Sequence, residues 1–134
     1  MFSVGDIAQV FSPVAGKKKY HLCVCCANEH GVERFLFINS GDGYEGDIVV
    51  DDKAIGCLPE SPTGQSVISC SIVVRYTDDQ LKKYNAKKLG ELRLDILEKV
   101  AKTVSATKAL SKEERNPISA SLSAHLKAKA GKST

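Results

Sequence analysis

Three consecutive lysines, Lys17, Lys18 and Lys19, stand between a segment that contains a proline and a glycine and an aliphatic stretch that begins at Tyr20. This pattern predicts a basic loop held between two strands. His21 lies two residues after Lys19, so the two side chains share a face if the segment is extended. Lysine can neutralise a phosphate, and histidine can exchange a proton near neutral pH. These residue types and their spacing favour chemistry on a phosphate-containing ligand.

Cleavage of RNA by its own 2′-hydroxyl needs a base, an acid for the leaving oxygen and positive charge near the phosphate oxygens. Lys19 can supply the charge, His21 the acid or base, and Arg75 a second positive charge. A plainer interpretation stays open for the lysines and for His21. The lysines also suit a solvated loop, and His21 also suits a partly buried imidazole with its hydrogen bonds satisfied.

Five cysteines, an odd number, occur without a secretion signal, which predicts reduced thiols and a cytoplasmic protein. They are Cys23, Cys25, Cys26, Cys57 and Cys70. A zinc site is one alternative, because the first three lie close to His21 and His30. Their regular spacing along an extended strand suits buried core thiols better than the ligands of a tetrahedral ion. We therefore expect no metal and no cofactor.

Length and composition predict one globular domain. The chain has 134 residues, of which 43% are hydrophobic, enough for one core and too few for two ordinary domains. Its apolar runs are far shorter than the roughly 18 residues of a membrane-spanning helix, so no membrane association is expected. The net charge of +3 is unevenly distributed, with lysines at 17–19 and near the C-terminus and acidic residues between 42 and 52. This asymmetry is consistent with a polyanionic ligand.

The first 76 residues carry the alternation and the β-branched residues typical of strands. We expect strands at 6–11, 20–26, 34–39, 47–50, 55–58 and 66–76, with the third central and the last either bent or divided in two. Alternation in the second strand predicts two sets of side chains on opposite faces. The sets are Tyr20, Leu22, Val24 and Cys26 on one face, and Lys19, His21, Cys23 and Cys25 on the other.

After Thr77 the spacing of apolar residues becomes helical. Thr77 suits the N-cap of a short turn over 78–81, and an amphipathic helix is expected from Ala86 onward. Two further helical pieces are expected, one from Ser111 with a capping box and one from Asn116 with a proline in its first turn. The second of these carries an apolar stripe that needs cover from the barrel or from a second subunit, formed by Ile118, Leu122 and Leu126.

Strands followed by helices indicate an α+β, mainly β fold. The short strands and regular turn signals favour a small SH3-like barrel of bent antiparallel strands with C-terminal helices. In this arrangement the barrel and its packing helix would occupy residues 1–106. A helical extension and a basic tail would occupy residues 107–134.

Several short segments resemble the MazF/PemK (Kid) growth-inhibitor toxins. They are Gly5-Asp6-Ile7, the basic loop and aliphatic strand at 16–24, Phe37-Ile38-Asn39-Ser40, and the late strand at 66–70 that runs on to Thr77-Asp78. The resemblance covers about residues 4–104. It implies an SH3-like barrel, a cytoplasmic homodimer, metal-independent cleavage of single-stranded RNA and neutralisation by an antitoxin protein.

The residue chemistry and the resemblance together give a set of candidate site residues. The catalytic candidates are Lys19, His21, Asn39 and Ser40. The candidates for RNA binding are Lys17, Lys18, Ser69, Ser71 and Arg75. These assignments predict an endoribonuclease of a toxin–antitoxin system.

This chain departs from the family pattern at two places, which suggests weakened activity. Lys19-Tyr20 stands where the family usually has Arg-Pro, and lysine lacks the bidentate fork of arginine. Ser69 and Ser71 flank Cys70 where the Kid-like branch has an arginine and an aspartate. The alternative is therefore a non-catalytic MazF-like module that binds nucleic acid or a protein partner, which gains if the two serines line a groove with Lys19. If the resemblance is a coincidence, only a small α+β domain remains.

Overall fold

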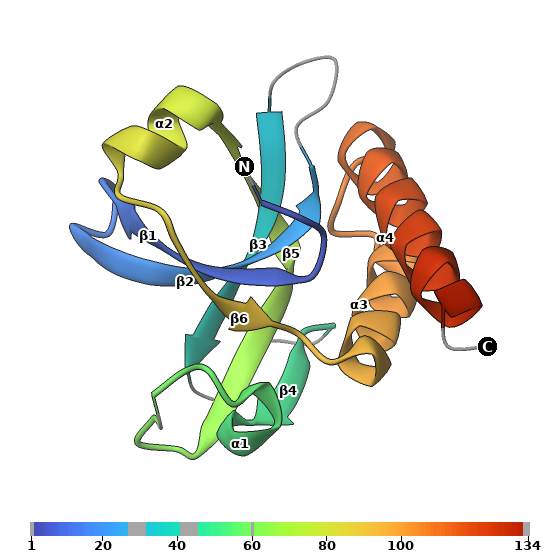
Figure 1. Cartoon of the computed structure of the whole chain (residues 1–134), viewed down its shortest axis with the longest axis horizontal. Coiled ribbons are helices and arrows are strands. Elements are labelled where there is room, and N and C mark those ends of the chain that lie inside the picture. The colour runs from blue at the N-terminus through green and yellow to red at the C-terminus, as the bar shows by residue number, and fades with distance from the viewer. Residues whose placement is uncertain (1, 27–31, 41–45, 60, 133–134) are drawn as a thin grey trace.

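The computed structural model describes residues 2–26, 32–40, 46–59 and 61–132 (Figure 1). These ranges contain six strands and four helices. The strands are β1 (Asp6–Ser12), β2 (Lys17–Cys25), β3 (Val32–Ser40), β4 (Ile48–Asp51), β5 (Gln65–Thr77) and β6 (Lys87–Glu91). The helices are α1 (Asp52–Ile55), α2 (Asp78–Lys83), α3 (Leu94–Ala106) and α4 (Lys112–Lys132). No helix among the described residues has both the length and the apolar character that crossing a bilayer requires.

The six strands form one antiparallel sheet in the order β4-β5-β3-β2-β1-β6. The sheet curls on itself like half of a barrel, and β3 lies in its interior as the sequence predicts (Figure 1). β5 is a single long strand that bends across the sheet. The predicted α+β class with bent antiparallel strands and C-terminal helices is therefore confirmed.

Two hydrophobic clusters lie on opposite sides of the sheet. The larger cluster packs α3 and α4 against one face and includes Leu22, Leu36 and Ile68 from the strands. Ile118 and Leu122 are fully buried in it, so the apolar stripe of α4 is covered within the chain itself. The smaller cluster lies on the other face, under α2, and is built around Phe35. Burial on both faces explains why the interior strands are nearly continuous runs of apolar residues.

The sequence predictions for residues 17–19 and 55–58 are wrong. Lys17, Lys18 and Lys19 belong to β2 and not to a loop, because they pair in register with Ser12, Phe11 and Val10 of β1. The turn of this hairpin is confined to the residues before them and uses Gly16 at φ 68°, a conformation that favours glycine. Residues 55–58 do not form a strand. Ile55 is the last residue of the short helix α1, and residues 56–58 follow it without helix or strand. The backbone N–H of Lys53 donates to the Asp51 carboxylate at 2.9 Å and caps the first turn of α1.

The predictions for the C-terminal half are partly confirmed. Thr77 caps α2 with a full capping box, as expected. The next helix begins at Leu94 and not at Ala86, because residues 87–91 pair with the free edge of β1 as strand β6. The two predicted pieces after Ser111 form one helix, α4, which continues through Pro117. Proline lacks the N–H of a helical hydrogen bond, and the buried side chains on the following turn stabilise the helix in spite of it.

Candidate functional site

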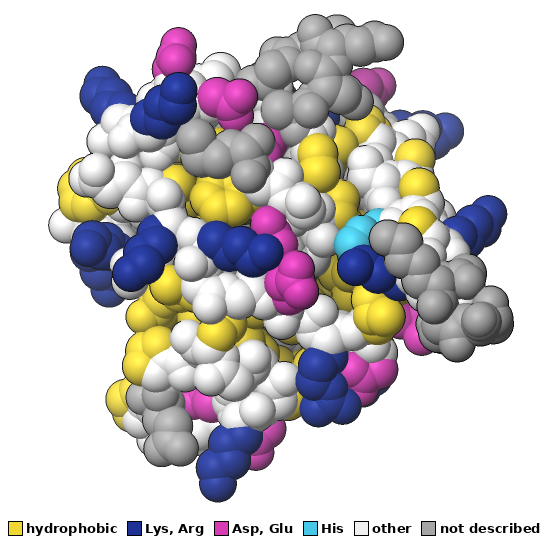
Figure 2. Space-filling view, viewed as in Figure 1, with side chains coloured by type: hydrophobic (Ala, Val, Ile, Leu, Met, Phe, Trp, Pro, Cys, Tyr) yellow, Lys and Arg dark blue, Asp and Glu magenta, His cyan; other side chains and the backbone are white. Residues whose placement is uncertain are grey.

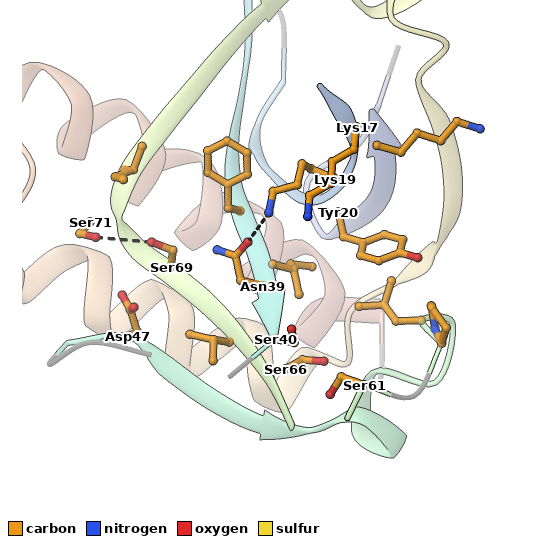
Figure 3. Close-up of a pocket in the computed structure, with 17 residues that line it drawn as sticks. Lys17, Lys19, Tyr20, Asn39, Ser40, Asp47, Ser61, Ser66, Ser69 and Ser71 are labelled. Atoms are coloured by element: carbon orange, nitrogen blue, oxygen red, sulfur yellow. Dashed lines mark hydrogen bonds between the residues drawn. The ribbon is translucent and has the colours of Figure 1, made fainter. Parts of the chain in front are cut away.

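A groove of about 740 Å³ opens where the first residues of β2 lie beside the last residues of β3 (Figure 3). β5 and the segment after α1 form its other walls. Most of its lining side chains are basic, hydroxylic or amide-bearing. They come from β2 (Lys17, Lys18, Lys19, Tyr20), from β3 (Phe37, Ile38, Asn39, Ser40), from β5 (Ser66, Val67, Ser69, Ser71, Ile72) and from the connecting segments (Asp47, Leu58, Pro59, Ser61).

Consecutive residues of β2 and β3 line the groove, although neighbours in a strand point to opposite faces. The groove therefore runs across the ends of these strands and not along one face. Antiparallel pairing places these ends together, because Tyr20 is opposite Ile38 in the ladder. Lys19 and Asn39 meet here, and the lysine Nζ donates to the amide Oδ1 at 3.1 Å. This hydrogen bond fixes the direction of the partly buried Lys19 side chain within the groove.

An irregularity in β5 brings two serine hydroxyls to the groove. Leu36 pairs with Val73, and Ile38 pairs with Ile68. Between these two pairs β3 has one residue, Phe37, whereas β5 has four, residues 69–72. The backbone N–H of Cys70 donates to Asp47 Oδ1 at 3.2 Å. Ser69 Oγ and Ser71 Oγ lie 3.4 Å apart within this irregular part of β5. Bulges of this kind redirect side chains at the rims of barrels and beside binding sites.

A buried aspartate, Asp52, binds two serines on the side of the groove that β5 and the segment after α1 form. Asp52 accepts hydrogen bonds from the Ser61 backbone N–H at 2.6 Å, from Ser61 Oγ at 2.9 Å and from Ser66 Oγ. These hydrogen bonds lower the pKa of the Asp52 carboxyl below its usual value, and the bond from the Ser61 backbone N–H has the largest effect. Asp52 therefore positions two hydroxyl-bearing residues of the groove without lining the groove itself.

The charge of the described lining residues is positive. Three lysines stand against one acidic residue, Asp47, whose carboxylate is engaged by the Cys70 backbone. Lys17 and Lys18 are exposed to solvent. Figure 2 shows a band of Lys and Arg side chains across the level of the β1–β2 hairpin, with a hollow and hydrophobic side chains below it. The groove thus offers positive charge, hydroxyls and apolar surface within one cavity.

His21 shares a face of β2 with Lys19, as expected, but it does not line the groove. Its ring is fully buried between Phe35, Phe37 and Tyr76, with centroid distances of 5.8, 5.0 and 5.8 Å. Nδ1 lies 3.0 Å from the Lys19 carbonyl oxygen. Burial lowers the pKa of His21 from 6.5 to about 4. The imidazole is therefore neutral at physiological pH and separated from ligands in the groove.

This burial predicts a loss of stability in mild acid. The pKa of His21 is lower in the folded chain than in the unfolded chain, so the unfolded chain binds the proton first as the pH falls. The free energy of unfolding should therefore decrease between about pH 6.5 and 4, by about 3 kcal/mol in all. Urea unfolding at a series of pH values measures this decrease.

The matched variants are His21→Gln and His125→Gln. We expect the first to remove most of the pH dependence in this range, because it removes the buried titrating ring. His125 is only partly buried, and its substitution should leave most of the slope in place. Equal slopes in His21→Gln and in the wild type would show that His21 titrates normally.

The structure brings together seven of the nine residues predicted for the site. Lys17, Lys18, Lys19, Asn39, Ser40, Ser69 and Ser71 line the groove. His21 and Arg75 do not. Arg75 Nη2 instead forms an ion pair of 3.3 Å with Glu114 Oε2 of α4, which ties β5 to the C-terminal helix.

Sequence reasoning missed the two aromatic side chains of the groove, Tyr20 and Phe37. Both are partly exposed. Phe37 lies two residues before Asn39, and this spacing could have placed both on the same face. Tyr20 is expected from the alternation on the same face of its strand as Leu22. It does pack against the larger cluster, but its position near the start of β2 also brings it to the groove.

Comparison of the chain with protein-family models and with curated protein sequences finds no match.

Proposed function

We propose that the groove binds single-stranded RNA and does not cleave it. The observation that carries this proposal is that Ser69 and Ser71 line the same groove as Lys19. Two neutral hydroxyls thus occupy the positions where the resembling toxins have charged residues. The groove keeps its positive charge without those groups, and this combination favours binding over catalysis.

Each group of lining residues suits one part of an RNA strand. The three lysines can neutralise neighbouring phosphates. The rings of Tyr20 and Phe37 offer surfaces on which unpaired bases can stack. The serine hydroxyls and the amide of Asn39 can exchange hydrogen bonds with 2′-hydroxyls and base edges. Stacking requires bases that are not already stacked in a duplex, which favours a single strand.

The groove lacks the groups that cleavage requires, as far as its described residues show. The described lining residues include no histidine, the side chain that most often exchanges protons in such reactions. Attack by the 2′-hydroxyl needs both a proton acceptor and a proton donor at the phosphate. His21, the candidate for these steps, is buried away from the groove with its pKa lowered.

We also propose that the chain is a non-catalytic relative of the MazF/PemK toxins. The motifs at 5–7, 16–24, 37–40 and 66–78 support this relationship, and so does the curled antiparallel sheet. Under this proposal the sheet is an SH3-like barrel, the chain is a cytoplasmic homodimer and an antitoxin protein is its partner. Light scattering of the purified chain tests the dimer.

The first experiment is binding of a fluorescent single-stranded RNA oligonucleotide, measured by anisotropy in excess EDTA. We expect salt-sensitive binding, weaker binding to an RNA duplex, and intact RNA on a denaturing gel. RNA fragments that appear without metal would instead support the endoribonuclease interpretation. Absence of binding at low salt would contradict both interpretations.

Phe37→Leu tests whether the ligand is a nucleic acid or any polyanion. Base stacking on an aromatic ring contributes about 1–3 kcal/mol, so the variant should bind single-stranded RNA at least about fivefold more weakly. Binding of heparin, which has no bases, should not change. Tyr84→Leu is the matched control, because Tyr84 is also partly buried but lies beside Tyr76, outside the groove. Equal losses for RNA and heparin in Phe37→Leu would exclude stacking.

A further inference from the structure

The side-chain amide of Asn39 has a fixed orientation in the groove. Its Oδ1 accepts the hydrogen bond of 3.1 Å from Lys19 Nζ. A lysine ammonium has three donors and no acceptor, so the oxygen of the amide and not its nitrogen must face the lysine. The amide nitrogen therefore points away from Lys19, toward the side of the groove where β5 carries Ser69 and Ser71 (Figure 3).

The two N–H groups of this amide can reach a ligand. Asn39 lines the groove and its side chain is partly exposed. Within the described part of the chain, the bond to Lys19 is the only hydrogen bond that this side chain makes. Asn39 thus offers two donors to the groove, while its acceptor oxygen is already engaged by a charged donor.

An aromatic ring lies next to this amide on the same side of β3. The flanking residues Leu36 and Ile38 both belong to the larger cluster, so Phe37 and Asn39 face the other side of the strand. Alternate residues of a strand are about 6.6 Å apart. The edge of a base stacked on Phe37, together with a hydrogen bond of about 3 Å, can span this distance. A base on the ring therefore presents its edge to the Asn39 amide.

The other polar side chains described in the groove do not oppose this preference for acceptors. The hydroxyls of Ser69 and Ser71 rotate and can either donate or accept, and the lysines only donate. Asp47 is the one carboxylate among the described lining residues, and its Oδ1 accepts the Cys70 backbone N–H at 3.2 Å. The amide of Asn39 is thus the group with a fixed direction that a base beside Phe37 meets.

We propose that Asn39 selects bases that carry a carbonyl oxygen, uracil and guanine, over bases that carry an amino group at the same position, cytosine and adenine. This inference rests on the proposed binding of single-stranded RNA. Uracil O4, like thymine O4, and guanine O6 are acceptors, whereas cytosine N4 and adenine N6 are donors. Asparagine commonly reads adenine with both atoms of its amide. Here Lys19 occupies the oxygen that such a contact needs.

Uracil and cytosine give the sharpest comparison, because they share one ring size and differ at the carbonyl or amino group and the neighbouring ring nitrogen. We expect the wild-type protein to bind an oligouridine of about ten nucleotides at least about fivefold more tightly than an oligocytidine of the same length. Anisotropy near neutral pH measures both affinities. Equal affinities would overturn the selection by Asn39 and leave RNA binding intact. Binding of neither oligonucleotide would overturn the proposed function as well.

Asn39→Asp assigns the preference to the amide. The carboxylate keeps the acceptor for Lys19 and replaces the two donors with a second acceptor. We expect the ratio of the two affinities to fall to one or to reverse in favour of oligocytidine. Asn116→Asp is the matched control, because Asn116 is exposed on α4, outside the groove, and its replacement adds the same charge. An unchanged ratio in Asn39→Asp would exclude Asn39 as the selecting residue.

Lys19→Met tests whether the lysine sets the direction of the amide. Methionine does not donate a hydrogen bond, so the amide can turn over and present its oxygen, and the ratio should fall toward one. Lys18→Met removes the same charge from the groove without touching Asn39. It should weaken the binding of both oligonucleotides and keep their ratio. A ratio that survives in Lys19→Met would contradict the role given to this hydrogen bond.

Discussion

Replacing Lys17, Lys18 and Lys19 together with glutamine is expected to lower the affinity for single-stranded RNA roughly 50-fold near physiological salt. Each lysine–phosphate contact on a single strand contributes about 0.7 to the slope of log affinity against log salt. Three contacts contribute a slope of about 2, which corresponds to roughly 50-fold between 1 M and 0.15 M salt. The three side chains line one groove, so their effects act on the same ligand. Anisotropy titrations at several salt concentrations measure both the affinity and the slope.

The matched control replaces Lys99, Lys102 and Lys108 with glutamine. These lysines are exposed, as Lys17 and Lys18 are, and their replacement changes the net charge by the same amount. They lie on α3 and just after it, outside the groove. We expect a change in affinity of less than about threefold and an unchanged slope. If both triple variants lose affinity equally, the overall charge of the protein determines binding and the groove does not.

Leu122→Ala is expected to lower the free energy of unfolding by about 2–5 kcal/mol. Leu122 is fully buried where α4 packs against α3 and β2, and truncation leaves a cavity in the larger cluster. Since small domains have a stability of about 5–15 kcal/mol, this single change removes a large share of the total. Urea unfolding followed by circular dichroism measures the loss. The result would show that α4 is required for the stability of the sheet.

Leu94→Ala is the control for this variant. Leu94 is a leucine in the first turn of α3 that remains 44% exposed, so its truncation should change stability by less than about 0.5 kcal/mol. A cost below about 1 kcal/mol for Leu122→Ala would mean that α4 detaches easily from the rest of the chain. In that case the buried stripe of α4 would not contribute to the core in solution.

The strand pattern in the first half of the chain was readable because each interior strand is buried. The runs at 6–11, 34–39 and 66–76 fall within β1, β3 and β5. The sequence predicts a helix at residues 87–91, because Lys-Lys-Leu-Gly-Glu has no strong preference for a strand. They become β6 because the outer edge of β1 offers backbone hydrogen bonds. A partner strand that is distant in sequence decides their structure.

The candidate site was predictable to the extent that local residue types define it. Lysines next to a strand indicated a phosphate ligand, and the motif at 37–40 supplied Asn39 and Ser40. The aromatic surfaces and the Asp52 network were not predictable. They depend on the bulge opposite Phe37 and on a connecting segment that folds back against the sheet.

The sequence by itself determined the order of most strands and helices, the apolar stripe of α4 and the concentration of positive charge at 17–19. These features are local, since they follow from alternation, helical spacing and adjacent charges. Only the tertiary structure decided that His21 is buried while Lys19, two residues away, lines a groove, because Phe35, Phe37 and Tyr76 come from other strands. It also decided that Cys23 and Cys25 point to opposite faces, against the prediction that they share one, because one extra residue in β2 reverses the faces of the residues that follow.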